Sequence, residues 1–276
     1  MSRTGESSLG RRRKLARGLV FDSGVGGLSV TEAIRARMPE LHLDYVADDA
    51  FRPYGNKTPA ELNARLPELL SILSDMLGSD FIVLACNTAS TTALPSIRAE
   101  LSLPVIGVVP AIKPAAAASQ TRHIGVLGTP GTVKRAYVDR LIRDFAQGCR
   151  VSLKGSVALV DAAERKLSGG PLDKTLLAAE LSEFQNQTPP IDHIVMACTH
   201  FPLLKDELSQ IMEDVTWVDS GAAIARRVEA ILQDAKLSPA AQSRAQLAFT
   251  TGTDLRDERR ALFRRRGFER LLSLSA

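Results

Sequence analysis

The sequence predicts an α/β protein of two pseudo-symmetric lobes, each a mostly parallel sheet flanked by helices, with the active site in the cleft between them. Short apolar segments alternate with longer amphipathic segments along most of the 276 residues, which is typical of this fold class. In addition, residues 80–86 and 192–198 match at five of seven positions, at a constant offset of 112 residues. Duplicated lobes that face each other form a cleft at the carboxyl ends of their strands, where α/β proteins bind ligands.

Strands are expected where apolar residues run without interruption, because parallel strands are buried on both faces. The strand at 81–86 recurs at 194–198, and a weaker match relates residues 18–23 to residues 124–129. The two halves of the chain therefore repeat the same order of strands and helices. In chain order, the expected strands are 18–22, 42–46, 81–86, 105–109, 123–127, 151–153, 194–198 and 217–219.

Helices are expected where apolar residues recur with helical spacing between these strands. A glycine turn leads from the first strand into the first helix, and a loop at 48–58 precedes the longest helix. Asn87 and Thr88 are favourable N-cap residues and Pro202 suits a first helical turn, so a helix is expected after each of the two matched segments. The other expected helices are 28–38, 59–77, 133–145, 174–184 and 222–234.

The composition is that of a mildly basic protein, with 35 Lys and Arg against 31 Asp and Glu and a formal net charge of +4. The excess lies at the two ends, and the middle of the chain has no basic stripe, so nucleic acid is not expected as the main ligand. Residues 1–16 are polar and basic and are expected to form a disordered, solvated tail. The longest apolar candidate for a membrane span, 105–118, is interrupted by Pro110, Lys113 and Pro114, so no membrane partner is expected.

The three cysteines are too few for a disulfide framework, and they lack the CxxC spacing of zinc sites. The N-terminus carries charge, but no apolar segment of a secretory signal follows it. These features predict a cytoplasmic protein in a reducing compartment, without a metal site.

Cys86 and Cys198 occupy matching positions in the two halves, each at the end of a strand and before a helix. The partial positive charge and free amide groups at a helix N-terminus stabilise a thiolate, and they also bind a ligand carboxylate. Cys149 lacks comparable polar neighbours and is interpreted as a small apolar residue. The sequence therefore predicts that one cysteine from each lobe faces the same cleft.

Two opposed thiols suit the removal of a proton from one face of a carbon and the return of a proton to the other face. That reaction is a racemisation or epimerisation, and it needs no cofactor. Cys198 beside His200 also fits a cysteine hydrolase, but Cys86 then has no role. A two-lobed protein that binds an amino acid without catalysis is a further alternative, and it leaves the matched cysteines unexplained.

Four segments resemble the signatures of glutamate racemases and occur in that family's order: FDSGVGGL at 21–28, PYGNK at 53–57, CNTA at 86–89 and CTHFPL at 198–203. The resemblance implies cofactor-independent interconversion of L- and D-glutamate, which supplies D-glutamate for peptidoglycan synthesis. It further implies that the second lobe is inserted in the first. On that plan the first lobe holds residues 17–111 and 219–276, and the second lobe holds residues 112–218.

The resemblance also implies roles for individual residues. Cys86 matches the base that deprotonates D-glutamate and Cys198 the base that deprotonates L-glutamate, while Asp22 and His200 match the polar groups that assist the thiols. Thr129 is a weaker candidate for contact with the side-chain carboxylate. Family members commonly form homodimers, and a cell-wall precursor is a candidate activator. The positions that match substrate-binding residues are Asp22, Ser23, Tyr54, Gly55, Asn87, Thr88, Thr199 and His200.

One stretch departs from the family's pattern, and one alternative substrate class stays open. Where relatives carry a Pro-Leu-Val-Glu-like stretch, this chain has residues 157–161, and the sequence leaves open whether Asp161 stands in for the glutamate that supports the Cys198 side. The nearest alternative function is an aspartate or hydantoin racemase of the same superfamily. His200 favours glutamate, since related aspartate racemases tend to carry Glu at that position.

Overall fold

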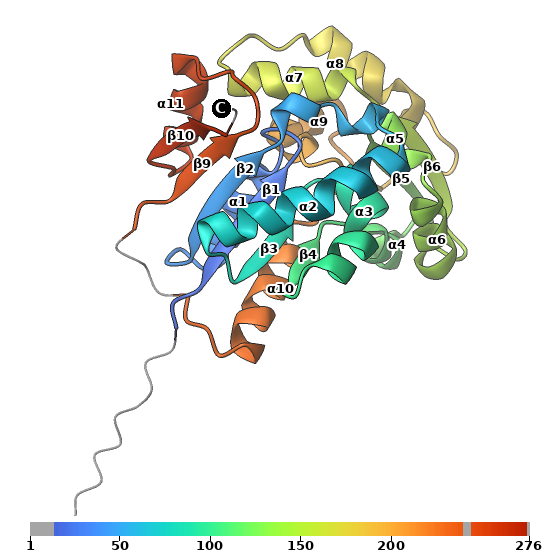
Figure 1. The fold of residues 1–276 in the computed structure, drawn as a ribbon. Coiled ribbons are helices and arrows are strands. Elements are labelled where there is room, and N and C mark those ends of the chain that lie inside the picture. The colour runs from blue at the N-terminus through green and yellow to red at the C-terminus, as the bar shows by residue number, and fades with distance from the viewer. Residues whose placement is uncertain (1–13, 240–243, 275–276) are drawn as a thin grey trace, which may run out of the picture.

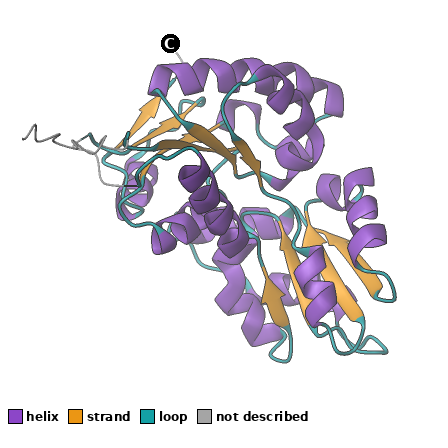
Figure 2. Cartoon of the chain, turned by 90° about the horizontal axis from the view of Figure 1, so that it is seen from below, coloured by secondary structure: helices purple, strands orange, loops and turns teal. Residues whose placement is uncertain are grey.

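The computed structural model describes residues 14–239 and 244–274, which form two parallel β-sheets with helices on both faces (Figures 1 and 2). In this part of the chain the first sheet has six strands and the second has four. The first sheet runs, in spatial order, β10 (Arg270–Ser273), β9 (Leu247–Thr250), β2 (His42–Ala47), β1 (Arg17–Asp22), β3 (Phe81–Leu84) and β4 (Val105–Gly107). The second sheet runs β6 (Arg150–Gly155), β5 (His123–Gly128), β7 (His193–Ala197) and β8 (Thr216–Val218).

The two sheets repeat one topology. Strands β2–β1–β3–β4 of the first sheet correspond in chain order and in spatial order to β6–β5–β7–β8 of the second, and neighbouring strands pair in parallel. β3 and β7 therefore hold equivalent places beside the first strand of each set. These are the two strands whose sequences match at a constant offset, so the expected duplication has a structural counterpart.

Each sheet has an apolar core on both faces, because alternate residues of a strand point to opposite sides. In β1, Val20 packs with one core of the first sheet, whereas Leu19 and Phe21 pack with the other. The first of these cores is covered by α1 (Leu28–Arg37), α10 (Gly221–Asp234) and α11 (Asp257–Arg265), and the second by α2 (Pro59–Leu77) and α3 (Asn87–Glu100). The second sheet is covered by α7 (Ala158–Leu167), α8 (Lys174–Leu181) and α9 (Lys205–Ile211) on one face and by α4 (Ile112–Ala118) and α6 (Ala136–Phe145) on the other.

The longest helix, α2, has strong start and stop signals in the sequence. Thr58 accepts a hydrogen bond from the Glu61 backbone N–H, and the Glu61 carboxylate accepts one from the Thr58 backbone N–H, which makes a capping box. Gly78 ends the helix in the left-handed conformation, at φ 62°. The buried face presents leucines at helical spacing: Leu62, Leu66, Leu70, Leu73 and Leu77.

Some predicted bounds differ from the structure for local reasons. The helix expected at 133–145 is two helices, α5 (Pro130–Val133) and α6, because Thr129 caps α5 and Arg135 adopts an extended conformation between them. The third strand of each repeat ends early, β3 at Leu84 and β7 at Ala197. Both matched cysteines therefore lie just beyond their sheets, where side chains are free to face the cleft.

Residues 14–16 and the arginines at 256, 259 and 266 make specific contacts within the protein. Residues 1–13 of the expected tail lie outside the described residues, but the expectation was wrong for residues 14–16. Leu15 forms a parallel bridge with Ser238, and Ala16 is fully buried. Several arginines near the C-terminus bind within the protein: Arg259 forms an ion pair with Asp49, Arg266 with Glu32 and Arg256 with Asp254. The pairs of Arg259 and Arg266 hold α11 and the residue after it to the segment that follows β2 and to α1, whereas the Arg256 pair is local.

The packing of α4 and α10 bears on the domain boundaries. α4 packs against β5 and β7 of the second sheet, and α10 packs in the core of the first sheet beside α1. The division of the chain near residues 111 and 218 stays a prediction, which this packing supports. Within the described residues, no helix is both long and apolar enough to cross a membrane.

The capping box at the start of α2 leads to a stability prediction. Replacing Thr58 by Ala removes the side-chain acceptor, so Thr58→Ala is expected to lower the free energy of unfolding by about 1 kcal/mol. Thr58→Ser retains the acceptor and is expected to stay near the wild-type value. Urea unfolding followed by far-UV circular dichroism measures both, and equal midpoints for the two variants would contradict the assignment.

Candidate active site

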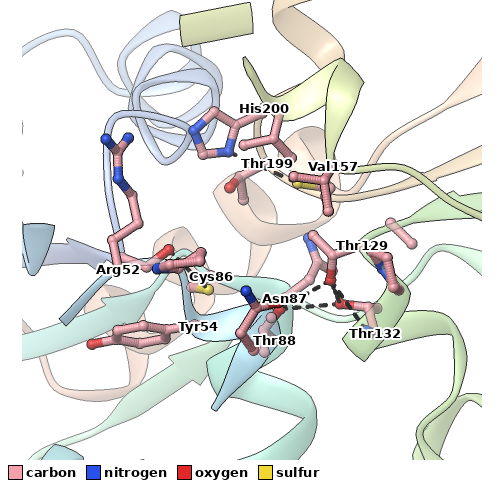
Figure 3. Close-up of a pocket in the computed structure, with 18 of the residues that line it drawn as sticks. Arg52, Tyr54, Cys86, Asn87, Thr88, Thr129, Thr132, Val157, Thr199 and His200 are labelled. Atoms are coloured by element: carbon pink, nitrogen blue, oxygen red, sulfur yellow. Dashed lines mark hydrogen bonds between the residues drawn. The ribbon is translucent and has the colours of Figure 1, made fainter. Parts of the chain in front are cut away.

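A cavity of about 320 Å³ lies where the carboxyl ends of the two sheets face each other (Figure 3). We call it the central pocket. The loops that follow β1, β2 and β3 contribute to its walls from the first sheet, and those after β5, β6 and β7 contribute from the second. Its lining residues are Ser23, Arg52, Pro53, Tyr54, Gly55, Asn56, Cys86, Asn87, Thr88, Thr129, Pro130, Thr132, Val157, Val160, Asp161, Ala197, Cys198, Thr199 and His200.

The predicted site residues lie together at this pocket. All of them line it except Asp22, whose side chain is fully buried directly behind the Ser23 wall. Cys86 and Cys198 come from opposite sheets, as expected from the repeat. Cys149 lies away from the pocket and is only partly buried.

Cys86 follows β3 and is the N-cap residue of α3. Its Sγ atom lies 3.6 Å from the Ser23 Oγ atom. Burial, together with the negative charge of Asp22, raises the pKa of the Cys86 thiol to about 12, and the Ala89 backbone N–H at the start of α3 lowers it by less. The helix N-terminus acts in the expected direction, but desolvation of the anion outweighs it, so the pKa of Cys86 favours the neutral thiol at neutral pH.

Cys198 follows β7 and has a different set of neighbours. Its Sγ atom lies 3.8 Å from the His200 Nδ1 atom, and the His200 Nε2 atom lies 2.9 Å from the Glu164 Oε1 atom. Burial by itself lowers the pKa of His200, but hydrogen bonds to Cys198 and Glu164 hold the ring proton and raise the pKa well above its usual value. The Cys198 sulfur is thus beside a histidine that holds its proton.

Asp22 ends β1 and connects the two lobes. Its carboxylate accepts hydrogen bonds from the Ser23 backbone N–H at 2.6 Å, the Ser23 hydroxyl at 3.2 Å and the Thr199 hydroxyl at 3.0 Å. Complete burial raises the pKa of Asp22, although His200 and these donors act in the opposite direction. A buried carboxylate that gathers donors from both lobes fixes the position of Thr199 relative to Ser23.

Hydroxyl groups from both lobes gather at one end of the pocket. The Oγ1 atom of Thr88 lies 3.1 Å from that of Thr132 and 3.4 Å from that of Thr129, and Thr129 and Thr132 are 2.9 Å apart (Figure 3). The Asn87 Oδ1 atom is buried without a hydrogen-bond partner, so it is an acceptor available to a ligand. Tyr54 turns its hydroxyl out of the pocket and donates to Asp48 at 2.6 Å, so only its ring faces the pocket.

The two lobes approach each other closely at this end. A Cβ atom on Gly131 would lie 2.5 Å from the backbone oxygen of Gly55. Position 131 therefore has room for glycine alone while the lobes stand as they do. Since Gly55 borders the pocket, this contact helps to set the width of its entrance.

The sequence analysis missed Glu164, Thr132 and Arg52, and it left open whether Asp161 takes the place of a supporting glutamate. Glu164 contacts His200. Asp161 lines the pocket but makes no hydrogen bond with His200. Both carboxylates lie on α7, three residues apart and on one face, so recognising a helix over this stretch would have offered Glu164 as the alternative. Among the described residues, no group of three or more His, Cys, Asp and Glu side chains is arranged to hold a metal ion.

Comparison with known proteins identifies the family. The Asp/Glu/Hydantoin racemase family model matches residues 27–228. The chain belongs to this family. It is 50% identical to the glutamate racemase of Vibrio cholerae over 215 residues, 78% of this chain and 80% of that one. It is 40% identical to the glutamate racemase of Actinobacillus pleuropneumoniae serotype 7 over 255 residues, 92% of this chain and 95% of that one.

Solved structures agree. A crystal structure of Escherichia coli glutamate racemase with L-glutamate and the activator UDP-MurNAc-Ala has a TM-score of 0.89 at 41% identity, covering 95% of this chain and 98% of that one. The Thermus thermophilus glutamate racemase has a TM-score of 0.76 at 32% identity, covering 95% and 97%. The resemblance seen in the four motifs, the α/β fold class and the assignment as an amino-acid racemase are confirmed.

The buried carboxylate of Asp22 leads to a prediction about stability and pH. Because burial raises the folded-state pKa of Asp22 above its unfolded value, the ionised carboxylate destabilises the fold at neutral pH. Asp22→Asn keeps the shape without the charge. Its amide oxygen accepts from Ser23 and its amide N–H donates to the Thr199 hydroxyl, which reverses one hydrogen bond, so it is expected to stabilise the protein by about 1 kcal/mol while lowering activity.

The stability difference between Asp22→Asn and wild type is expected to depend on pH in one direction. The advantage of Asp22→Asn is expected to be full above the folded-state pKa, to shrink as the pH falls through it, and to vanish below the unfolded pKa. Thermal unfolding of both proteins from pH 8 down to pH 4 measures this. A variant less stable than wild type at pH 8 would show that the ionised carboxylate contributes net stability.

Proposed function

We propose that the protein is a glutamate racemase that interconverts L- and D-glutamate by proton transfer between two cysteines and the α-carbon, without a cofactor. The observation that carries the proposal is the placement of Cys86 and Cys198, from opposite lobes, on the walls of one pocket. A substrate held between them presents one face of its α-carbon to each thiol, as a two-base racemisation requires.

The protonation of the two cysteines supports one direction of reaction in the unliganded site. Cys198, beside the His200 imidazolium, is set to act as a thiolate and remove the α-proton of L-glutamate. Cys86, held as a thiol, is set to give its proton to the opposite face. The product is D-glutamate, with Cys198 as a thiol and Cys86 as a thiolate. The reverse reaction starts from that state, so the protons balance over a full cycle.

The other residues are assigned to binding and to the charge that develops in the transition state. Amide N–H groups at the start of α3 and the hydroxyls of Ser23 and Thr199 are suited to hold the α-carboxylate as negative charge builds on the carbon. Asn87, with its unpartnered acceptor oxygen, is suited to the ammonium group. The cluster of Thr88, Thr129 and Thr132 is suited to the side-chain carboxylate.

Other functions fit these observations less well. A cysteine hydrolase would use Cys198 and His200 and leaves a second buried thiol across the pocket without a role. An amino-acid binding protein has no need of that second thiol either. An aspartate racemase shares the mechanism, and the similarity to several glutamate racemases favours glutamate.

The proposal extends to the setting of the enzyme. We place it in the cytoplasm, where its D-glutamate supplies peptidoglycan synthesis, and we propose that it acts as a homodimer. Because the Escherichia coli relative was crystallised with the activator UDP-MurNAc-Ala, we also propose that a cell-wall precursor of this kind activates the present protein.

Deuterium exchange tests the reaction and its two bases. In D₂O with reductant and no added cofactor, the wild-type protein is expected to remove the α-proton signal of L-glutamate from the proton NMR spectrum while D-glutamate appears in a chiral assay. Cys86→Ser and Cys198→Ser are each expected to lower racemisation by at least ~1,000-fold, since a serine alkoxide is a far less accessible base. Cys149→Ser is the matched control and is expected to keep wild-type activity. Full activity in either of the first two variants would overturn the two-base mechanism, and exchange of L-aspartate alone would change the substrate.

The activator proposal has its own measurement. Racemisation of L-glutamate is expected to rise several-fold when UDP-MurNAc-Ala is added, and light scattering in the same buffer is expected to give the mass of a dimer. Unchanged rates across micromolar to millimolar precursor would remove the activator from the proposal, and a monomer mass would remove the homodimer.

A further inference from the structure

An arginine from the first lobe reaches the histidine of the second through Glu164. Arg52 lies in the loop between β2 and α2, and its Nη1 atom donates to the Glu164 Oε1 atom at 2.5 Å. The same oxygen atom contacts His200 Nε2 at 2.9 Å. A continuous chain of contacts thus runs from Cys198 through His200 and Glu164 to Arg52. Figure 3 shows the Arg52 side chain rising alongside the His200 ring at the edge of the pocket.

We propose that Arg52 is a positioning residue that shares the Glu164 carboxylate with His200 from across the lobe boundary and so controls proton transfer at Cys198. The proposal rests on the proposed racemase function. Cys198, His200 and Glu164 all belong to the second sheet and its helices, so they stay together when the lobes separate. Arg52 alone comes from the first lobe. The chain is therefore complete only when the lobes stand as close as they do here.

The loop that carries Arg52 is anchored on both sides, which makes it suitable for this role. On one side, Asp49 accepts a hydrogen bond from the Thr250 hydroxyl at 2.7 Å and pairs with Arg259. On the other side, the Tyr54 hydroxyl donates to Asp48, and the Tyr54 ring contacts the Phe51 ring with centroids 6.1 Å apart. Because the loop is fixed to the first lobe, the distance between the Arg52 guanidinium and Glu164 depends on the position of that lobe relative to the second.

Sharing of one oxygen atom has an electrostatic consequence. Glu164 is partly exposed, at 22% of its side chain, and Arg52 takes part of the negative charge that would otherwise bind the His200 proton. Removing the Arg52 charge is expected to strengthen the Glu164–His200 bond and to raise the pKa of His200 further. A histidine that holds its ring proton more tightly shares it less readily with the Cys198 sulfur 3.8 Å away, which slows the step at that cysteine. The charged and titratable groups around this chain are Asp22, Tyr45, Asp49, Cys86, Asp161 and Arg259.

Kinetics distinguish this role from a structural one. L- and D-glutamate have equal free energy, so kcat/KM must change by the same factor in both directions. The selective effect appears in primary isotope effects, because deuterium on L-glutamate reports the step at Cys198 and deuterium on D-glutamate reports the step at Cys86. Arg52→Met is expected to lower kcat/KM roughly tenfold, as a misplaced proton-transfer group does. It is also expected to enlarge the isotope effect with L-glutamate and to diminish it with D-glutamate.

Two further variants complete the kinetic test. Arg52→Lys restores the charge and one donor, so it is expected to recover a large part of the activity and the wild-type isotope effects. Arg37→Met is the control, because Arg37 also forms an ion pair, with Glu229, far from the pocket-lining residues. Loss of activity in Arg52→Met with unchanged isotope effects would overturn the proposal. A rise in KM alone would overturn it too and would assign Arg52 to substrate binding.

A titration without substrate separates this proposal from the proposed function. In protein labelled with ¹³C-histidine, His200 is assigned by the signal missing from His200→Gln, and its pKa is followed from pH 5 to pH 11. Arg52→Met is expected to shift the His200 titration to higher pH, and Arg37→Met is expected to leave it unchanged. An unchanged or lower His200 pKa in Arg52→Met would contradict the proposal. A wild-type protein that fails to racemise glutamate overturns the proposed function instead.

Discussion

One constraint sets the whole site: strands within each sheet run parallel, and the carboxyl ends of both sheets face the same cavity. Each strand therefore delivers the residues that follow it to the pocket. β1 delivers Asp22 and Ser23, β3 delivers Cys86, β5 delivers Thr129, and β7 delivers Cys198. Apolar strands buried on both faces hold these positions, so the chemistry depends on a core that takes no part in it.

The duplication of one topology does not make the two halves of the site equivalent. Cys86 has a serine and a buried carboxylate as neighbours, whereas Cys198 has a protonated histidine. Similar backbone positions thus place the two cysteines in different polar surroundings. The asymmetry arises from side chains around the repeat, since His200 and its partner Glu164 stand on the Cys198 side only.

Patterns within short segments carried most of the sequence-based prediction. The alternation of strands and helices predicted the fold class, and the repeat predicted that Cys86 and Cys198 face one cleft. The resemblance of four motifs to glutamate racemases added the other pocket residues. The structure added what depends on distant contacts. Glu164 was missed because a carboxylate three residues away, Asp161, lay nearer to the expected motif, and only the three-dimensional position of His200 decides between them. The effect of burial on the pKa of Cys86 was missed for a related reason, because the degree of burial is a property of the whole fold. The orientation of Tyr54 also depends on a distant contact. Its hydroxyl donates a hydrogen bond to Asp48, and the motif around Tyr54 does not predict this.

The contact between Gly131 and Gly55 offers a way to change the separation of the two lobes. At that point the lobes are separated by backbone atoms alone, with no side chain between them. A single methyl group at position 131 would act as a wedge, because the atom it meets is a backbone oxygen that cannot rotate away. The same fold with an alanine there is a ready means of holding the lobes apart, and a ligand too bulky for the closed cavity would then find the entrance open.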